Sequence, residues 1–224
     1  MLQAEYTGDD LLIEMFAQGY DIHGYTAVQV GKLDCTPNEA KKKYPKLRQL
    51  YKSVRFLLQY GGTEFALMRS TGLSKEEARA AIDDYYVTFK GEADYKVKQI
   101  RFAHKYGFVY SLMRRKRHLE GINSNNKKVS SYFERLALNY PNQSGAADVI
   151  MEAQILVDKN KRLKELNYRQ VMQTHDEIIG IVPKKHVEES IKIVQKIMET
   201  CVKLETVKLI ADGGYSDVCY AFAK

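Results

Sequence analysis

The segment from Tyr44 to Gln59 is the feature that most limits how this chain can fold. Pro45 stands near its start, where proline is tolerated, no further proline follows, and the pair Gly61-Gly62 ends it. This pattern predicts one continuous helix. With 224 residues, of which 45% are hydrophobic, the chain is long enough to bury a core, as one large domain or two small subdomains.

Further helices are predicted from their start signals. Asp9 precedes LLIEMF and Asp21 precedes IHGYTAVQV, and aspartate is a favoured residue just before the first helical turn. Ser74 and Glu77 form a capping box before a second long run, and a similar box with proline at the first helical position begins at Thr36. The first half of the chain is therefore predicted to be mainly helical.

The second half mixes helix and strand signals. Helices are predicted over residues 128–138 and 146–163, separated by a break at Pro141, and over residues 186–203. Runs rich in β-branched and aromatic residues predict a basic hairpin over 108–119, a second hairpin from strands 168–174 and 178–182, and two last strands over 207–212 and 218–223. The predicted fold class is α+β.

Composition sets limits on function without naming one. Lys and Arg exceed Asp and Glu by 35 to 28, a formal net charge of +7, which favours polyanionic partners. The three cysteines have no metal-ligand spacing and are an odd number, so neither a disulfide framework nor a structural zinc site is expected. No signal peptide or membrane-spanning run is recognisable, and a cytoplasmic location with no membrane partner is expected.

One stripe of the first helix combines cations with aromatic residues. Arg48, Lys52, Phe56 and Tyr60 recur every four residues and fall along one slowly drifting line. Arg and Lys donate to phosphate oxygens and aromatic faces hold bases and sugars, so the stripe is typical of a nucleotide-binding surface. The alternative is packing, because aromatic residues at helical spacing usually belong to the core. The stripe alone leaves both interpretations open.

Two more polar groups stand at turns or breaks. Asp176 and Glu177 follow His175 at the tip of the predicted hairpin, and adjacent carboxylates bind divalent cations, although acidic residues are also routine turn formers. The group around the proline break could consist of ordinary caps; it comprises Glu134, Arg135, Asn139 and Gln143.

Considered together, these segments resemble the family A DNA polymerases, the bacterial repair polymerase and its phage and mitochondrial relatives. The family carries an R-x3-K-x3-F/Y-x3-Y-G helix, and Arg48, Lys52, Phe56, Tyr60 and Gly61 fill those places. Three further motifs agree in the same order: D-I-H at residues 21–23, E-R-x3-N-x-P-x-Q-x2-A-A-D at 134–148, and H-D-E at 175–177. The resemblance extends over nearly the whole chain and favours a phage-type member.

The resemblance implies a fold division and a set of residue roles. It implies a palm segment over 1–34, a fingers subdomain over 35–130 and a palm over 131–224. The implied nucleotide-binding residues are His23, Arg48, Lys52, Phe56 and Tyr60, with Lys52 also a proton donor to the departing pyrophosphate. The implied DNA contacts are Arg135, Asn139, Gln143 and His175. Phe56 in place of the tyrosine of some relatives is associated with discrimination against nucleotides that lack a 3′-hydroxyl.

The implied chemistry uses two Mg²⁺ ions held by two aspartates on different palm strands. Asp176 matches one of them, with Glu177 as an auxiliary carboxylate. The other belongs to a D-Y-S-Q-I-E-L-R-like motif that precedes the segment matched by residues 4–16, and it is not found in this sequence. Asp9 and Asp10 fall at a helix start and are not assigned as that metal-binding aspartate. Gly62 and Cys219 also depart from the family pattern.

Three interpretations of that missing aspartate remain. In a split polymerase, a separate N-terminal polypeptide supplies it, and the assembled enzyme extends a primer-template with dNTPs. Alternatively, the chain is a non-catalytic remnant that binds DNA, or a basic DNA-binding accessory module. Retention of Arg48, Lys52, Asp176 and Glu177 together favours the split polymerase. A palm without its first strand would expose apolar sheet, so marginal stability without a partner is expected.

Overall fold

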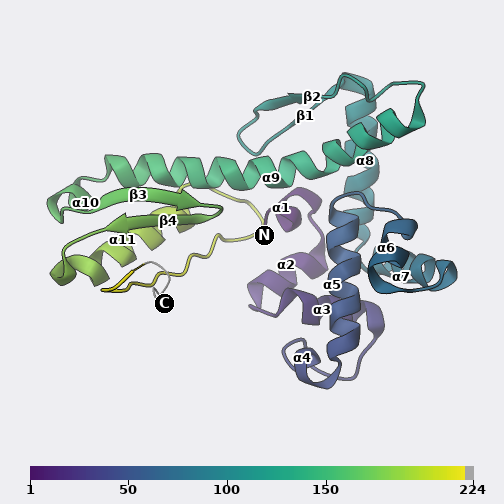
Figure 1. Ribbon diagram of the computed structural model, residues 1–224, viewed down its shortest axis with the longest axis horizontal. Coiled ribbons are helices and arrows are strands. Elements are labelled where there is room, and N and C mark those ends of the chain that lie inside the picture. Colours follow the sequence, from purple (N-terminus) through teal and green to yellow (C-terminus); the bar gives the residue numbers. More distant parts are fainter. Residues whose placement is uncertain (220–224) are drawn as a thin grey trace. The chain divides into compact units, whose positions relative to one another are not determined.

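The computed structural model describes residues 1–219 and confirms the α+β class (Figure 1). It divides into two compact units, residues 1–142 and the part from Gln143 onward. Each of its two small sheets is a single antiparallel hairpin. No helix in the described residues is long and apolar enough to cross a membrane.

The first unit is a helical assembly around α5, with one hairpin. Its elements in chain order are α1 (Leu2–Thr7), α2 (Asp10–Ala17), α3 (Ile22–Gly31), α4 (Ala40–Lys43), α5 (Pro45–Gln59), α6 (Glu64–Thr71), α7 (Lys75–Thr88), α8 (Lys90–Tyr106), β1 (Phe108–Tyr110), β2 (Lys116–His118) and the first part of α9 (Lys127–Lys159). α5 packs against α3, α4, α6 and α7. The predicted continuous helix is therefore the central element of this unit.

The cap signals explain where several of these helices begin. The Asp9 side chain accepts from the backbone N–H of Leu12, and the Asp21 side chain accepts from that of Gly24, as expected for residues that precede a helix. The Ser74–Glu77 capping box is complete. Half of the box expected at Thr36 forms, since the Glu39 carboxylate accepts from the Thr36 N–H at 2.9 Å. The Thr36 hydroxyl donates to the same carboxylate, and α4 begins at Ala40 and not at Pro37.

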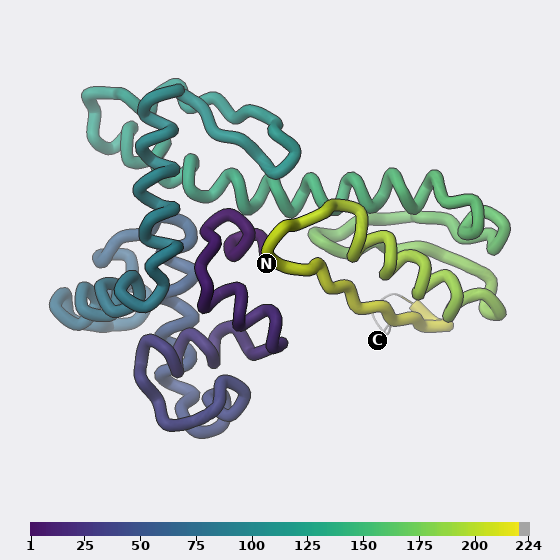
Figure 2. Tube along the Cα trace, turned by 180° about the vertical axis from the view of Figure 1, so that it is seen from behind, coloured from purple at the N-terminus to yellow at the C-terminus, as the bar shows by residue number. Residues whose placement is uncertain are grey.

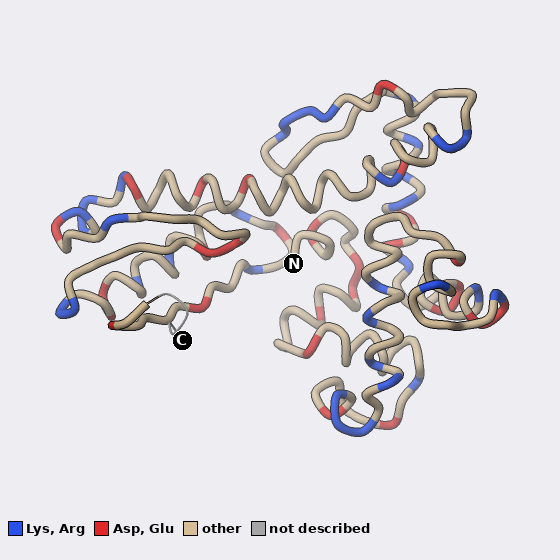
Figure 3. The backbone as a smooth tube through the Cα atoms, viewed as in Figure 1, with Lys and Arg blue, Asp and Glu red and all other residues tan. Residues whose placement is uncertain are grey.

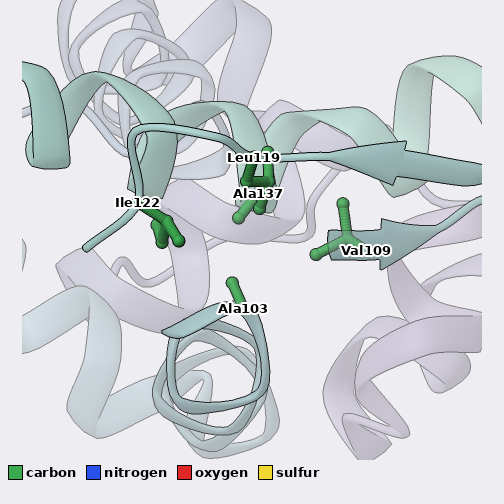
Figure 4. Packing of buried hydrophobic residues seen from close by; sticks show 5 residues of the cluster. All are labelled: Ala103, Val109, Leu119, Ile122 and Ala137. Carbon is green, nitrogen blue, oxygen red and sulfur yellow. The ribbon is translucent and has the colours of Figure 1, made fainter. Parts of the chain in front are cut away.

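The predicted basic hairpin is confirmed as β1 and β2, which pair from Phe108 opposite His118 to Tyr110 opposite Lys116. Figure 2 shows the chain passing from the end of α8 through this hairpin into α9. The apolar side of the hairpin packs on both helices. Figure 4 shows that small core, whose members are Ala103, Val109, Leu119, Ile122 and Ala137.

The predicted helix break at Pro141 is wrong, because α9 continues through it from Lys127 to Lys159. A proline inside a helix removes one N–H donor and costs about 3 kcal/mol. The carbonyl of Ala137, four residues earlier, would have accepted that hydrogen bond. It accepts instead from the side-chain amide of Gln99 at 3.2 Å, and the Tyr6 hydroxyl donates to the Pro141 carbonyl at 3.0 Å. Side chains from elsewhere in the fold thus support the helix where proline would end it.

The second unit contains the second hairpin and the helices that precede and follow it. Its elements are the remainder of α9, α10 (Lys161–Glu165), β3 (Arg169–Thr174), β4 (Glu177–Ile181), the 3-10 turn η1 (Lys184–His186) and α11 (Val187–Thr200). Buried apolar side chains from its helices and one later residue form its core: Ile150, Ala153, Val157, Leu163, Leu166 and Val207.

The strand predicted over 207–212 is not formed. Side chains of α11 bond that backbone instead of a neighbouring strand: Gln195 donates to the Ala211 carbonyl and the Glu199 carboxylate accepts from the Ala211 N–H, each at 3.2 Å. The last predicted strand is absent at Val218 and Cys219, and the rest of it lies outside the described residues.

Candidate functional site

α5 carries two different stripes of side chains. Its core stripe is buried and consists of Tyr51, Val54, Arg55 and Leu58. The predicted stripe points elsewhere, since Phe56 is 43% exposed and Tyr60 is 40% exposed. Large aromatic side chains left this open are not the core of the helix. The structure therefore decides against the packing alternative and leaves this face available for a ligand.

Arg48 is held in place by the residue that caps α3. Its Nε and Nη2 atoms donate to the two carboxylate oxygens of Asp21 at 2.7 and 2.8 Å, a bidentate pair. The same carboxylate accepts from the Gly24 N–H at 2.7 Å. The hydrogen bonds from Arg48 are the main reason that the pKa of Asp21 lies below its ordinary value. Arg48 has five N–H donors, so donors remain for an anion after this pairing.

His23 lies next to Phe56 and within a group of cations. The two rings are 5.4 Å apart between centroids and tilted by 44°. Burial, followed by the charge of Arg48, lowers the pKa of His23, and Lys52 and Arg55 act in the same direction. Its Nδ1 atom is buried and has no hydrogen-bond partner in the described part of the chain. The cations around this neutral imidazole, whose Nδ1 atom has no hydrogen-bond partner, form an environment that would favour an incoming anion.

Lys52 is half-buried and, among residues 1–219, forms no ion pair. Figure 3 shows basic residues along α5. The structure thus brings Arg48, Lys52, His23 and Phe56 together within the first unit, as a cationic surface beside an exposed aromatic ring. Such a surface can bind phosphate groups at one end and stack on a sugar or base at the other.

The end of α5 lies close to α9. Tyr60 is the residue after the helix, and Gly61 adopts a left-handed backbone with φ of 68°. A Cβ atom on Gly61 would come within 3.1 Å of both the Arg135 and Leu138 side chains. Glycine is thus required here both for its conformation and for the close approach. This contact brings Tyr60 and the predicted DNA contact Arg135 into the same region.

The remaining predicted DNA contacts on α9 follow Arg135 at helical spacing. Arg135 and Gln143 are exposed, and Asn139 between them is half-buried. The Oδ1 atom of Asn139 is buried without a hydrogen-bond partner among the described residues. Residues four apart on a helix share a face. The side chains therefore present amide and guanidinium groups along one line of α9.

The predicted metal hairpin is confirmed as a hairpin. β3 and β4 pair from Arg169 opposite Ile181 to Thr174 opposite Glu177, which leaves His175 and Asp176 as a two-residue turn. His175 has a φ of 52°, a conformation that two-residue hairpin turns require and that His tolerates better than most side chains. The Gln173 amide donates to the His175 carbonyl at 2.6 Å. His175, Asp176 and Glu177 are all exposed, and they lie in the second unit.

The carboxylates at this tip fit Mg²⁺ by their chemistry, because Mg²⁺ is usually bound through one or two carboxylates together with water and substrate phosphates. Within the described residues no group of three metal-ligating side chains exists. Among those residues, Asp176 and Glu177 are adjacent carboxylates that do not belong to a larger cluster of possible ligands.

Comparison with known proteins defines the class. Residues 1–219 match the profile of DNA polymerase family A, so this chain belongs to that family. It is 36% identical over 209 residues to the DNA polymerase I of Streptococcus pneumoniae strain R6, and 36% identical over 222 residues to that of Bacillus caldotenax. These matches cover 93% and 97% of this chain but only 23% and 24% of the relatives' length.

A solved structure agrees with the sequence relatives. The POL domain of Pol1 from M. smegmatis, in complex with DNA primer-template and dNTP, superimposes with a TM-score of 0.85 at 31% identity. The match covers 93% of this chain and 36% of the M. smegmatis chain. The fold described above is therefore that of part of a polymerase domain.

Two features of the site were not predicted from the sequence. The first is the bidentate pair between Asp21 and Arg48, which joins residues 27 positions apart and has no local signal. The second is the buried position of Arg55. The spacing of Tyr51, Val54 and Leu58 would have indicated it, because Arg55 falls on the same face.

Proposed function

We propose that this chain is the nucleotide-binding and metal-binding part of a DNA-directed DNA polymerase, and that it acts with a separate polypeptide carrying the other metal-binding aspartate. The observation that carries the proposal is the cationic, half-open surface of α5, which is anchored by Asp21 and lies beside His23. Family membership supports the reaction class. In this proposal residues 35–130 are the fingers, and residues 1–34 and 131–224 belong to the palm.

The reaction is template-directed nucleotidyl transfer. The oxygen of the primer 3′-hydroxyl forms a bond with the α-phosphorus of a dNTP, the bond from that phosphorus to the bridging oxygen of the β-phosphate breaks, and pyrophosphate leaves with the bonding electrons. The hydroxyl proton is lost to solvent or a base. Bound Mg²⁺ would activate the hydroxyl and neutralise the developing phosphate charge.

The residues of α5 and α3 position the triphosphate. Arg48 and Lys52 donate to its non-bridging oxygens, and Lys52 supplies a proton to the departing pyrophosphate. His23 adds a donor once phosphate is close, because a nearby anion raises the pKa of an imidazole. Phe56 packs against the sugar and Tyr60 stacks near the templating base. Each of these roles is electrostatic or steric, so it depends on how firmly α5 is held.

The hairpin and α9 supply the remaining contacts. Asp176 and Glu177 would hold Mg²⁺ together with the aspartate from the partner polypeptide. His175, Arg135, Asn139 and Gln143 contact the primer-template near the new base pair.

A second candidate function, DNA binding without synthesis, is favoured by the β1–β2 hairpin. Residues 113–118 are all exposed and include five consecutive basic side chains, from Arg114 to His118. The Lys116 ammonium lies 4.6 Å from the ring centre of Phe108, so the cation stands on an aromatic surface. A basic strand of this kind can bind a phosphate backbone without any catalytic role.

Primer extension with Mg²⁺ and four dNTPs separates these functions. We expect no synthesis by the chain alone. We expect synthesis when it is mixed with a family A polymerase fragment that supplies the first metal motif, and loss of that synthesis with Asp176→Ala. DNA binding without synthesis in the mixture would favour the second function. Synthesis by the chain alone would overturn the proposed need for a partner.

A further inference from the structure

The core face of α5 contains one charged residue, Arg55, which is 4% exposed and stands between Val54 and Leu58. A buried guanidinium is unfavourable unless it is paired and hydrogen-bonded, and well-packed apolar residues commonly fill such positions with equal or better stability. Arg55 is not among the residues assigned to nucleotide binding. Its presence at this position therefore calls for an explanation other than core packing.

Arg55 is connected to three other helices, two of them directly and one through Glu92. Its Nη2 atom donates to Glu92 of α8 at 3.2 Å, and the two side chains are each 5% exposed. Its Nη1 atom donates to the Thr26 hydroxyl of α3 at 3.5 Å, and its guanidinium lies 5.5 Å from the ring centre of Phe89, which precedes α8. The Tyr85 hydroxyl of α7 donates to the other Glu92 oxygen at 2.7 Å. A single side chain of α5 is thus connected, directly or through Glu92, to α3, α7 and α8.

The groups around Glu92 act on its carboxylate in opposite directions. Burial raises the pKa of Glu92, and Asp9 acts in the same direction, whereas Arg55 and the Tyr85 hydroxyl lower it. The Asp9 carboxylate is itself occupied by the Gly91 N–H at 2.8 Å. Glu92 accordingly depends on Arg55 and Tyr85 for its stabilising contacts. Hydrogen bonds of this kind require particular angles, whereas apolar contacts tolerate sliding and small rotations.

The positions of the proposed nucleotide-binding side chains depend on how α5 is rotated about its own axis. Side-chain atoms lie about 6 Å from a helix axis, so a 15° rotation moves them by about 1.5 Å. A misplacement of about 1 Å can cost on the order of a hundredfold in the rate of a reaction that depends on orientation. Arg55 directly precedes Phe56 and is one turn beyond Lys52 on the same helix.

We propose that Arg55 is a positioning residue: its hydrogen bonds to Glu92 and Thr26, supported by Tyr85, fix the rotation of α5 and so orient Arg48, Lys52 and Phe56. The effect on nucleotide binding rests on the proposed function, whereas the effect on α5 itself does not. In this view the buried ion pair contributes specificity of geometry, and hydrophobic residues could match its stability without matching its orientation.

The test uses a double variant of the full chain, Arg55→Met/Glu92→Leu, which replaces both charges with apolar groups. We expect the double variant to fold, with a denaturation midpoint lowered at most by the cost of the buried Tyr85 hydroxyl that loses its acceptor. We expect the α5 amides to exchange hydrogen about tenfold faster relative to those of α6, and the affinity for Mg²⁺-free dATP to fall about tenfold. The control Arg79→Gln/Asp83→Asn removes an exposed pair of opposite charges on α7 and should change neither quantity.

The outcomes are distinguishable. Wild-type dATP affinity in the stable double variant, or wild-type exchange in α5, overturns the inference. If the wild-type chain binds no dATP, the proposed function fails, and the exchange of α5 alone decides about Arg55. If the double variant does not fold, Tyr85→Phe removes only the hydroxyl that supports Glu92, and the same changes are expected in the same direction, about threefold in size. Their absence in Tyr85→Phe would then overturn the inference.

Discussion

The α5 surface and the β3–β4 tip both carry motif residues, yet the fold supports them very differently. On α5, Arg48 is bound by Asp21, Phe56 lies beside His23, and the buried face is fixed by Arg55. On the hairpin, Asp176 and Glu177 are exposed at the end of a two-stranded sheet. A nucleotide surface can be organised within one unit, whereas a two-metal site needs carboxylates from several strands.

The hairpin also leaves apolar surface open. Val171 is 55% exposed, and Met172 and Ile181 are each 48% exposed. An isolated two-stranded sheet is marginally stable and usually needs a further strand or a helix against it. If another polymerase segment packs here, as expected, it would cover these exposed apolar side chains. For the proposed function, the α5 surface is thus the prepared half of the site, held in place by its own unit, and the hairpin tip is the unprepared half.

The largest expected effect is on the unprepared half. Asp176→Ala should reduce primer extension by the assembled polymerase by at least about 10³-fold, because a metal ligand acts directly on the reacting groups. It should change the free energy of unfolding by less than about 0.5 kcal/mol, since the side chain is exposed. Extension assays and urea titrations measure both.

The matched control for Asp176 is Asp158→Ala, another exposed aspartate of the second unit, on α9. It should leave extension unchanged. An equal loss of primer extension in the two variants would remove the reason to place a metal at the hairpin tip. It would also remove the proposed difference between the tip and the α5 surface.

The next effect concerns the prepared half. Lys52→Ala should weaken dNTP binding by about ten- to a hundredfold, because a charge-assisted hydrogen bond to phosphate is worth about 1.5 to 3 kcal/mol. Isothermal titration calorimetry with the chain alone checks this. Lys46→Ala alters an exposed lysine in the first turn of the same helix, off the predicted stripe, and should have little effect. A loss of affinity with Lys46→Ala as large as that with Lys52→Ala would mean that α5 attracts nucleotide only through its net charge.

A third prediction tests whether the open apolar surface of the hairpin receives another segment. Val171→Thr/Met172→Gln should weaken association with the complementing polymerase fragment by about tenfold and should raise the solubility of the isolated chain. Analytical ultracentrifugation measures both. Val87→Thr changes a valine of α7 that is 68% exposed and serves as the control. Association that is unaffected by the double change would place the partner elsewhere.

The smallest expected effect concerns stability and tests the ion pair between Asp21 and Arg48. Asp21→Asn keeps a good helix cap but loses the charged bidentate pair, so stability at neutral pH should fall by about 1 kcal/mol. The pKa of Asp21 is lowered in the folded chain. Its contribution is therefore present above the ordinary value of 3.8 and is lost as the pH falls through the lower folded value.

The corresponding measurement is the difference in unfolding free energy between wild type and Asp21→Asn from pH 7 to pH 2.5. That difference should be constant down to about pH 4 and shrink below it. A difference that grows on acidification would contradict the assigned pair.

Sequence reasoning was most successful where the signal is local. The helix over α5, the Ser74 box and the two hairpins are confirmed, because caps, glycine stops and β-rich runs act within a few residues. It was wrong at Pro141 and over residues 207–212. In both places side chains from distant segments, Gln99 and Tyr6 in one and Gln195 and Glu199 in the other, take part in the backbone hydrogen bonds.

The sequence by itself determined the family motifs, their order and the elements that carry them, since these depend on residue identity and short spacing. Only the tertiary structure decided which stripe of α5 is buried, that Asp21 holds Arg48, and that Arg55 is joined to Glu92. Helical spacing defines which residues share a face but not which face meets the core, because that choice depends on partners 27 and 37 residues away.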